Sequence, residues 1–509
     1  MMLKIKLLFV CGLFFFLSCN LPTEINTGGT AIVAGKSKIT GRIIAPDNQN
    51  RDSIVLTITV PHPISGENVR YNFLADQSGR FSLDFDVETE TSLVGLYTSV
   101  NAGKSLIIKS INGDSIHIDI AYDSGLNIKY ADVTPDMNLY DVGQSIQVLN
   151  KLIDYRPDRP DGENPRLYDK STDEFLGYVE SNVSERLALF VDNDKLFSKE
   201  FKGFIAKDYR LFIYTGHVFD YEAEMKRHYR HVTQDTVGKP EIQKIDLSYF
   251  RFLKDFNLSD PQYLQTFTFA EFQNLILHNE VLGLPVIGES DIPSWLASVK
   301  VILADLVGFD DGPYYDVLAA NAYGRQLNER GKPLTEKQKE QISNYWENGE
   351  IAKILLRKNQ QVVELDKVKS PTVINDVSTV PEDNVMETIV SNYKDKVVFI
   401  DLWATWCAPC LDAMKQFRGT KGGFRYEDVV FVYLTNGSSP KKLWEEKIQG
   451  IGSEHYYLTD SQWTYMMEHF GFDGIPSYLL YDKEGVLIDK FTGFPGNDIV
   501  REMIDGLLK

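Results

Sequence analysis

The sequence predicts a multidomain protein in which an N-terminal antiparallel β-sandwich, a middle irregular α-helical domain and a C-terminal α/β domain follow one another. Its 509 residues are too many for a single hydrophobic core and suggest about three domains. The spacing of apolar residues also changes twice along the chain. The net charge of −19 argues against a nucleic-acid partner, because phosphates would be repelled.

The first 18 residues are predicted to be a signal peptide for export, followed by a flexible tether over residues 19–37. A basic start precedes an apolar run at 7–17 that is too short to cross a bilayer as a helix. The run ends in Phe-Leu-Ser-Cys, which resembles the lipobox of bacterial lipoproteins, so Cys19 would carry the lipid anchor. Export without a lipid and an uncleaved membrane anchor are the competing interpretations.

The cysteine content isolates one pair of thiols. Of the four cysteines, Cys11 would leave with the signal peptide and Cys19 would be blocked by lipid, which leaves Cys407 and Cys410. An exported protein of this size could use structural disulfides freely, yet this chain has no further cysteines to form them. The composition therefore points to a single redox couple.

The first predicted domain, residues 38–122, alternates apolar and polar residues with a period of two. The pattern is clear at 54–60, 81–87 and 116–120, and turn-forming residues such as those at 112–114 separate the segments. Short alternating strands at this spacing predict a small antiparallel sandwich in which each sheet buries one face.

The middle predicted domain, residues 123–366, has a helical pattern. Ser171 with Glu174 forms a capping box, and apolar residues recur every four positions after it. Thr335 with Gln338 repeats the same signal for the start of a helix. We expect an irregular α-helical domain without internal repeats.

The last predicted domain, residues 367–509, alternates strands and helices and should form an α/β domain with a mixed sheet. The continuous apolar run at 397–403 fits a buried central strand, and both cysteines follow it directly. Further strands are predicted at 428–434, 455–458, 477–481 and 486–491, with helices from near 438 and over 462–470 and 498–508.

The sequence Trp-Cys-Ala-Pro-Cys at 406–410 begins a predicted helix. Free N–H groups and the dipole at a helix N-terminus favour an anion, so the pKa of Cys407 should fall and its thiolate should be a nucleophile. Cys410 lies about one helical turn further on, where it can attack a mixed disulfide. A zinc site is disfavoured because no second pair of ligands is supplied, and a structural disulfide would close too short a loop to constrain the unfolded chain.

The segment Phe-Ile-Asp-Leu-Trp-Ala-Thr-Trp-Cys-Ala-Pro-Cys at 399–410 resembles the active-site strand of thioredoxins, particularly the TlpA-like family of envelope thiol–disulfide oxidoreductases. Gly-Ile-Pro-Ser at 474–477 resembles the cis-proline loop of that family. The resemblance covers little more than the last quarter of the chain. It implies a thioredoxin-like fold in which Cys407 attacks and Cys410 resolves, and we expect neither a cofactor nor a metal.

The resemblance also assigns roles to residues around the cysteines. Asp401 would be the buried acid that takes the proton from Cys410, unless it lies at a strand edge and reaches water. Pro476 would be cis, and the backbone of its neighbour Ile475 would bind an extended substrate; a trans proline at the start of a strand is the alternative. Trp406 would flank the substrate, although a single tryptophan more often serves packing alone.

A β-sandwich and a helical region ahead of a thioredoxin-like domain resemble envelope lipoproteins of Bacteroidetes in architecture. The leading hypothesis is a periplasm-facing lipoprotein that reduces disulfides of other envelope proteins with electrons from a membrane donor. An oxidase or isomerase is an open alternative, because the same motif works in either direction depending on its potential. A partner-binding lipoprotein with the thioredoxin fold as a docking platform is another. The intact cysteine pair, Asp401 and Pro476 argue against it.

Overall fold

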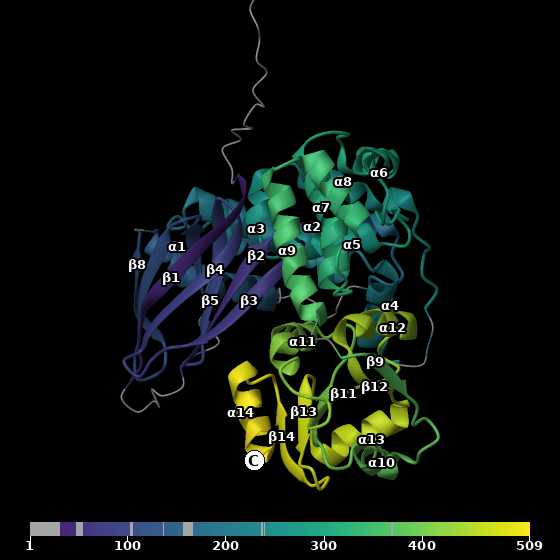
Figure 1. Cartoon of the computed structure of the whole chain (residues 1–509). Coiled ribbons are helices and arrows are strands. Elements are labelled where there is room, and N and C mark those ends of the chain that lie inside the picture. The colour runs from purple at the N-terminus through teal and green to yellow at the C-terminus, as the bar shows by residue number, and fades with distance from the viewer. Residues whose placement is uncertain are drawn as a thin grey trace, which may run out of the picture.

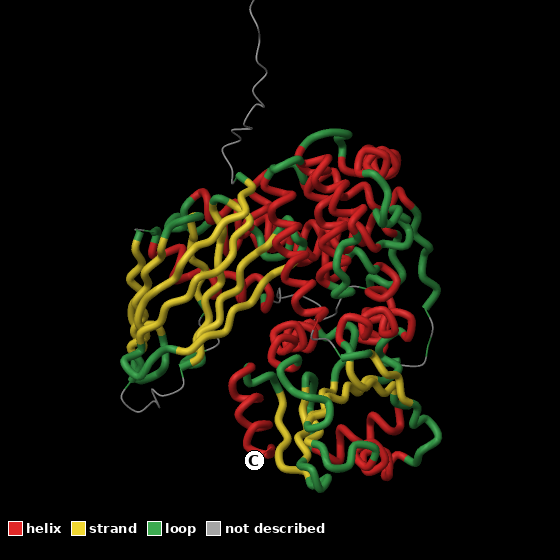
Figure 2. Tube along the Cα trace, viewed as in Figure 1, coloured by secondary structure: helices red, strands yellow, loops and turns green. Residues whose placement is uncertain are grey.

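The computed structural model describes residues 31–46, 54–101, 105–135, 137–155, 166–235, 238, 240–367 and 370–508. The predicted signal peptide, Cys11, Cys19 and the first part of the predicted tether lie outside these ranges. Figures 1 and 2 show a strand-rich region beside a helical region, with the C-terminal α/β region below both. In the described part of the chain, no helix combines the length and apolar character needed to cross a membrane.

Two four-stranded sheets face each other in the N-terminal region, with strand orders β4-β1-β7-β8 and β3-β2-β5-β6. The alternating residues on their inner faces share one core, which includes Ile58, Phe85 and Ile118. The strands are β1 (Ile32–Ile44), β2 (Val55–His62), β3 (Glu67–Leu74), β4 (Arg80–Thr89), β5 (Thr91–Thr98), β6 (Leu106–Ile111), β7 (Ser115–Tyr122) and β8 (Ile128–Thr134).

Three details of this region correct the sequence-based expectation. β1 runs parallel to β7, so the first sheet is mixed and not antiparallel. Alternation specifies which face is buried but not strand direction, and no hairpin links these two strands. β1 begins within the predicted tether. β8 lies beyond the predicted domain boundary at residue 122 and pairs with β7. The strand-rich region is therefore longer at both ends than the predicted domain 38–122.

The middle region packs its helices around an aromatic core to which Tyr214, Phe219, Phe252 and Phe272 contribute. Both predicted capping boxes are confirmed, at the N-termini of α2 and α8. The helices are α1 (Leu139–Asp154), α2 (Thr172–Leu187), α3 (Lys199–His217), α4 (Tyr221–Thr233), α5 (Phe269–His278), α6 (Ile292–Val307), α7 (Pro313–Asn328), α8 (Glu336–Trp346) and α9 (Glu350–Lys367).

The C-terminal region has a six-stranded mixed sheet in the order β14-β13-β10-β11-β12-β9. β10 lies inside the sheet, parallel to β11 and antiparallel to β13. Helices α10 and α13 cover one face, and α11, α12 and α14 cover the other. The elements are β9 (Thr372–Asn375), α10 (Val385–Ser391), β10 (Val397–Leu402), α11 (Ala408–Lys421), β11 (Val429–Thr435), α12 (Lys441–Ile451), β12 (Ser453–Tyr457), α13 (Asp460–Phe470), β13 (Ser477–Tyr481), β14 (Leu487–Thr492) and α14 (Asn497–Leu508).

The sequence predicts this mixed sheet but not β9 and α10. β9 has only four residues, all of them partly or fully exposed, so it has no apolar alternation to reveal it. α10 is two turns long and follows a short 3₁₀ segment, which is too little for a recognisable helical period.

Candidate active site

Both cysteines lie where β10 passes into α11. Cys407 is the N-cap residue of α11, and the backbone N–H of Cys410 donates to Cys407 Sγ at 3.2 Å. The two form a disulfide with their Cα atoms 5.3 Å apart. Cys410 is fully buried, and Cys407 retains only 3% exposure. Because free N–H groups and the helix dipole point at Cys407, its reduced sulfur is placed where a thiolate is favoured.

The predicted cis-proline is confirmed, since the Ile475–Pro476 peptide bond is cis. The loop leads into β13, whose first residue, Ser477, pairs with Leu402 at the end of β10. Ile475 packs against the buried cluster that contains both cysteines. The fold therefore brings a segment 66 positions after Cys410 to the end of the active-site strand.

Trp406 lies at the surface beside the disulfide. Its side chain is 64% exposed, and its Nε1 donates to the hydroxyl of Ser438 at 3.3 Å. The neighbouring backbone N–H of Thr405 donates to the hydroxyl of Ser439 at 3.0 Å. An aromatic ring this exposed contributes little to core packing and is free to contact another molecule. The two serines are functional candidates that the sequence analysis misses, because ordinary serines after a strand carry no distinguishing signal.

Asp401 is buried in β10, the strand that leads to the cysteines. It is 4% exposed in a strand paired on both sides, which rules out the alternative of an acid at a strand edge. Its Oδ1 has no hydrogen-bond partner among the described residues. Burial raises the pKa of Asp401 well above its ordinary value, and the positive charge of Lys421 opposes this only in part. The carboxyl group therefore keeps its proton to a higher pH than an exposed aspartate does.

Two tyrosines and a lysine surround this acid. Tyr433 and Tyr478 occupy the positions paired with Asp401 on either side, and both belong to the buried cluster of the cysteines. Lys421, at the end of α11, donates to the Tyr433 hydroxyl at 3.2 Å and to the backbone oxygen of Ile451 at 2.6 Å. The sequence does not predict this arrangement, because Lys421 has the pattern of an ordinary basic residue at a helix C-terminus.

The outer face of α11 contacts both upstream regions. Asp412 pairs with Arg70 of β3 at 3.1 Å, and Lys415 lies 3.4 Å from Glu67 of the same strand. Glu67 also pairs with Lys358 of α9. Burial alone would raise the pKa of Glu67. The positive charges of Lys358 and Lys415 outweigh this effect and lower the pKa to about 2. In Figure 1, α11 accordingly lies below the C-terminal end of α9 and close to β3.

No group of three or more His, Cys, Asp or Glu side chains suited to a metal ion occurs among the residues that the structure describes. The arrangement at the end of β10 instead supplies two sulfurs, a buried acid and a cis-proline loop. A cysteine pair in this position can take part in thiol–disulfide exchange.

Comparison with known proteins shows what the chain is similar to. The family model described as Redoxin matches residues 354–504. Thiol-disulfide oxidoreductase ResA from Geobacillus thermodenitrificans (strain NG80-2) is 23% identical over 118 residues, 23% of this chain and 67% of that protein. ResA from Geobacillus kaustophilus (strain HTA426) is 26% identical over 104 residues, 20% of this chain and 59% of that protein. The solved structure of the pneumococcal exposed lipoprotein thioredoxin Etrx1 from Streptococcus pneumoniae (strain TIGR4) is 23% identical in sequence. The match covers 23% of this chain and 90% of that one, with a TM-score of 0.19.

The family match lies in the C-terminal region, and the chain spans 67% and 59% of the length of the two ResA proteins. Both ResA relatives are named as thiol-disulfide oxidoreductases. Residues 354–504 therefore match the Redoxin family, and the chain is similar to the thiol-disulfide oxidoreductases ResA.

Proposed function

We propose that the chain reduces disulfides of other cell-envelope proteins through Cys407 and Cys410. The observation that carries this proposal is the pairing of the two cysteines at the N-terminus of α11, within a domain of thiol–disulfide oxidoreductase type. Residues 1–19 support the location: a signal peptide followed by a lipid on Cys19 would hold the protein at a membrane, facing the periplasm.

The reaction begins with the reduced pair. The Cys407 thiolate attacks one sulfur of a substrate disulfide, so a bond from Cys407 to the substrate forms and the substrate S–S bond breaks. The thiolate that leaves takes a proton from water. Cys410 then gives its proton to the Asp401 carboxylate and attacks Cys407 Sγ, which forms the Cys407–Cys410 disulfide and releases the second substrate thiolate. The substrate gains two electrons, and a membrane electron donor would have to reduce the pair again.

The groups around the disulfide would hold the substrate. The backbone of Ile475 beside the cis-proline Pro476 would align an extended chain, and the exposed Trp406 ring would cover it. Such positioning keeps the reacting sulfurs in line, which is the main way in which a protein accelerates a two-centre exchange.

Trapping of mixed disulfides tests this proposal directly. Reduced full-length protein with Cys410→Ser should form a covalent complex with insulin, because the attack by Cys407 proceeds but no thiol remains to release the substrate. The complex should appear on a non-reducing gel and disappear with dithiothreitol. Cys407→Ser is the matched control and should trap nothing. Failure of Cys410→Ser to trap insulin would contradict an exchange role and leave the docking-platform alternative.

A further inference from the structure

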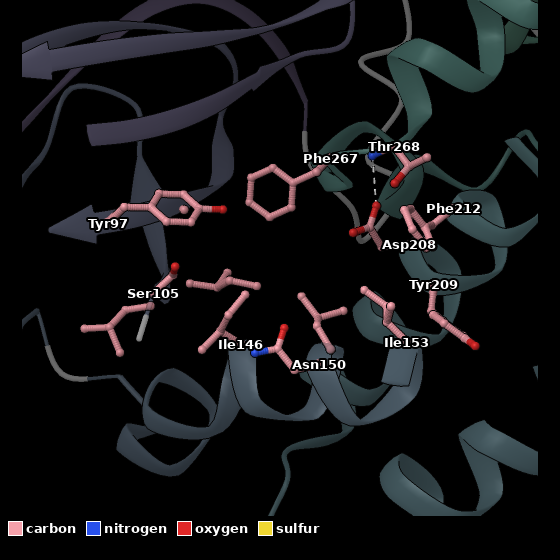
Figure 3. A pocket seen from close by; sticks show the side chains of 14 residues that line it. Tyr97, Ser105, Ile146, Asn150, Ile153, Asp208, Tyr209, Phe212, Phe267 and Thr268 are labelled. Atoms are coloured by element: carbon pink, nitrogen blue, oxygen red, sulfur yellow. Dashed lines mark hydrogen bonds between the residues drawn. The ribbon is translucent and has the colours of Figure 1, made fainter. Parts of the chain in front are cut away.

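A cavity of about 240 Å³ lies away from the cysteines, between the strand-rich region and the helices packed against it. Its walls come from β5, from the residues at the start of β6, from α1 and from α3. Most of the lining is apolar, including Ile146 and Ile153 of α1, Phe212 of α3 and Phe267 (Figure 3). Ile153, Phe212 and Tyr97 are also exposed to solvent, so a molecule can enter past them.

Asp208 places a carboxyl group in this apolar surrounding. Its side chain is buried, and one oxygen accepts from the backbone N–H of Thr268 at 2.9 Å. Figure 3 shows the other oxygen turned toward the cavity. Among the described residues, no Lys, Arg or His side chain forms an ion pair with Asp208. Burial raises the pKa of Asp208 to about 6, because hydrogen bonds from the backbone and side chain of Thr268 and from the backbone of Phe267 compensate only part of the lost hydration.

The opposite side of the cavity carries further polar groups. The Tyr97 hydroxyl points into the space, and Ser105 lies beside it (Figure 3). Ser105 is 3% exposed, and in the described part of the chain its hydroxyl has no hydrogen-bond partner. A buried hydroxyl without a partner is unfavourable, and a ligand that bonds to it would remove that cost. A carboxyl group without a counter-charge and an unpaired hydroxyl thus lie on two sides of one apolar cavity.

We propose that this cavity binds a small aromatic amine, with the ammonium group paired to Asp208 and the ring held among the apolar side chains. The pairing supplies the counter-charge that the protein does not. The aromatic rings of Tyr97, Phe212 and Phe267 add favourable contacts to a cation and to a ring. A carboxylate ligand would be repelled by Asp208, and a purely apolar ligand would leave the Asp208 carboxylate without a counter-charge.

The size of the cavity fits this class of ligand. A cavity of roughly 150 Å³ suffices for benzene. About 240 Å³ therefore accommodates a benzene ring with a two-carbon chain that ends in an amine. A larger amphipathic molecule such as a phospholipid does not fit.

Calorimetric titration of the full chain with phenethylamine tests the proposal, with 2-phenylethanol as an uncharged ligand of the same shape. We expect phenethylamine to bind at least tenfold more tightly than the alcohol at pH 7.5, where Asp208 is ionised. Asp208→Asn should remove this preference while the alcohol binds as before. Asp255→Asn makes the same chemical change at an exposed site outside the cavity and should leave both affinities unchanged.

A second variant guards against loss of folding, since Asp208 also holds the backbone at Thr268. Ile146→Trp fills the cavity from α1 without touching Asp208 and should abolish binding of both ligands. Equal affinity for the amine and the alcohol would overturn the proposal, as would full binding to Ile146→Trp. Absence of any heat with phenethylamine up to millimolar concentration would also overturn it.

Discussion

Replacement of Asp401 by asparagine should slow resolution of the mixed disulfide by about 10²- to 10⁴-fold, the usual contribution of a positioned acid or base. Asp401 lies in the strand that leads to the cysteines, is 4% exposed and has an oxygen without a partner among the described residues. Asparagine keeps the shape but cannot accept the proton of Cys410. The first attack by Cys407 should be unaffected, so the mixed disulfide should accumulate in single-turnover experiments.

The pH dependence of this step has a definite sign. Only the carboxylate form of Asp401 accepts a proton, and its pKa is raised by burial. The resolution rate of the wild-type protein should therefore rise as pH increases through that raised pKa, and Asp401→Asn should lack this rise. Asp489→Asn, an exposed change on β14, is the matched control. A wild-type rate and pH profile in Asp401→Asn would show that another group takes the proton.

Stability provides a check that the Asp401 variant is folded. A carboxyl group whose pKa is raised on folding costs stability as pH rises, because the folded state resists its ionisation. Asp401→Asn should therefore melt at the same temperature as the wild-type protein or higher at neutral pH. A lower melting temperature would mean that slow resolution reflects damage to the fold and not loss of a proton acceptor.

Glu67→Ala should weaken the attachment of α11 to the upstream regions by about 2–3 kcal/mol. Glu67 is nearly buried and pairs with Lys358 and Lys415, so its removal leaves two cations without their counter-charge. The cost lies below the roughly 3–5 kcal/mol typical of a fully buried pair, because Lys415 remains partly exposed. Amide hydrogens of α11 should exchange roughly 30- to 150-fold faster in the variant.

Hydrogen exchange followed by mass spectrometry measures this change peptide by peptide. Glu364→Ala, which removes an exposed partner of Lys367 on α9, should alter exchange by less than about twofold. Because the pKa of Glu67 falls from 4.5 to about 2 on folding, its contribution is present above pH 4.5 and is lost as pH falls toward 2. The difference in melting temperature between Glu67→Ala and the wild-type protein should shrink over that range. Unchanged exchange in α11 would contradict a role for Glu67 in attachment.

The features that the sequence predicts best are those encoded locally. The helix at the cysteine pair can be predicted because an apolar strand comes directly before it and the two cysteines are three positions apart. The burial of Asp401 can be predicted because it is a lone carboxylate within that apolar strand. The cis form of Pro476 follows from a four-residue motif of the family. Each of these lies within one segment, so periodicity or a motif is enough to reveal it.

The features that the sequence does not predict join distant segments. Glu67 and Lys415 are 348 positions apart, and neither differs in its local context from an ordinary surface charge. The parallel pairing of β1 with β7 and the contact of Lys421 with Tyr433 depend in the same way on tertiary packing. Local patterns report burial and helix ends but not which buried faces meet.

The equilibrium reduction potential of the Cys407–Cys410 pair tests the proposed direction of the reaction most directly. The full chain would be equilibrated in dithiothreitol or glutathione buffers and the free thiols counted by alkylation and mass spectrometry. A reductase predicts a value near that of thioredoxin, about −270 mV, or lower. A value of about −120 to −180 mV would contradict the reductase and identify an oxidase or isomerase. A pair that fails to exchange at all would contradict the proposed exchange role of these two cysteines.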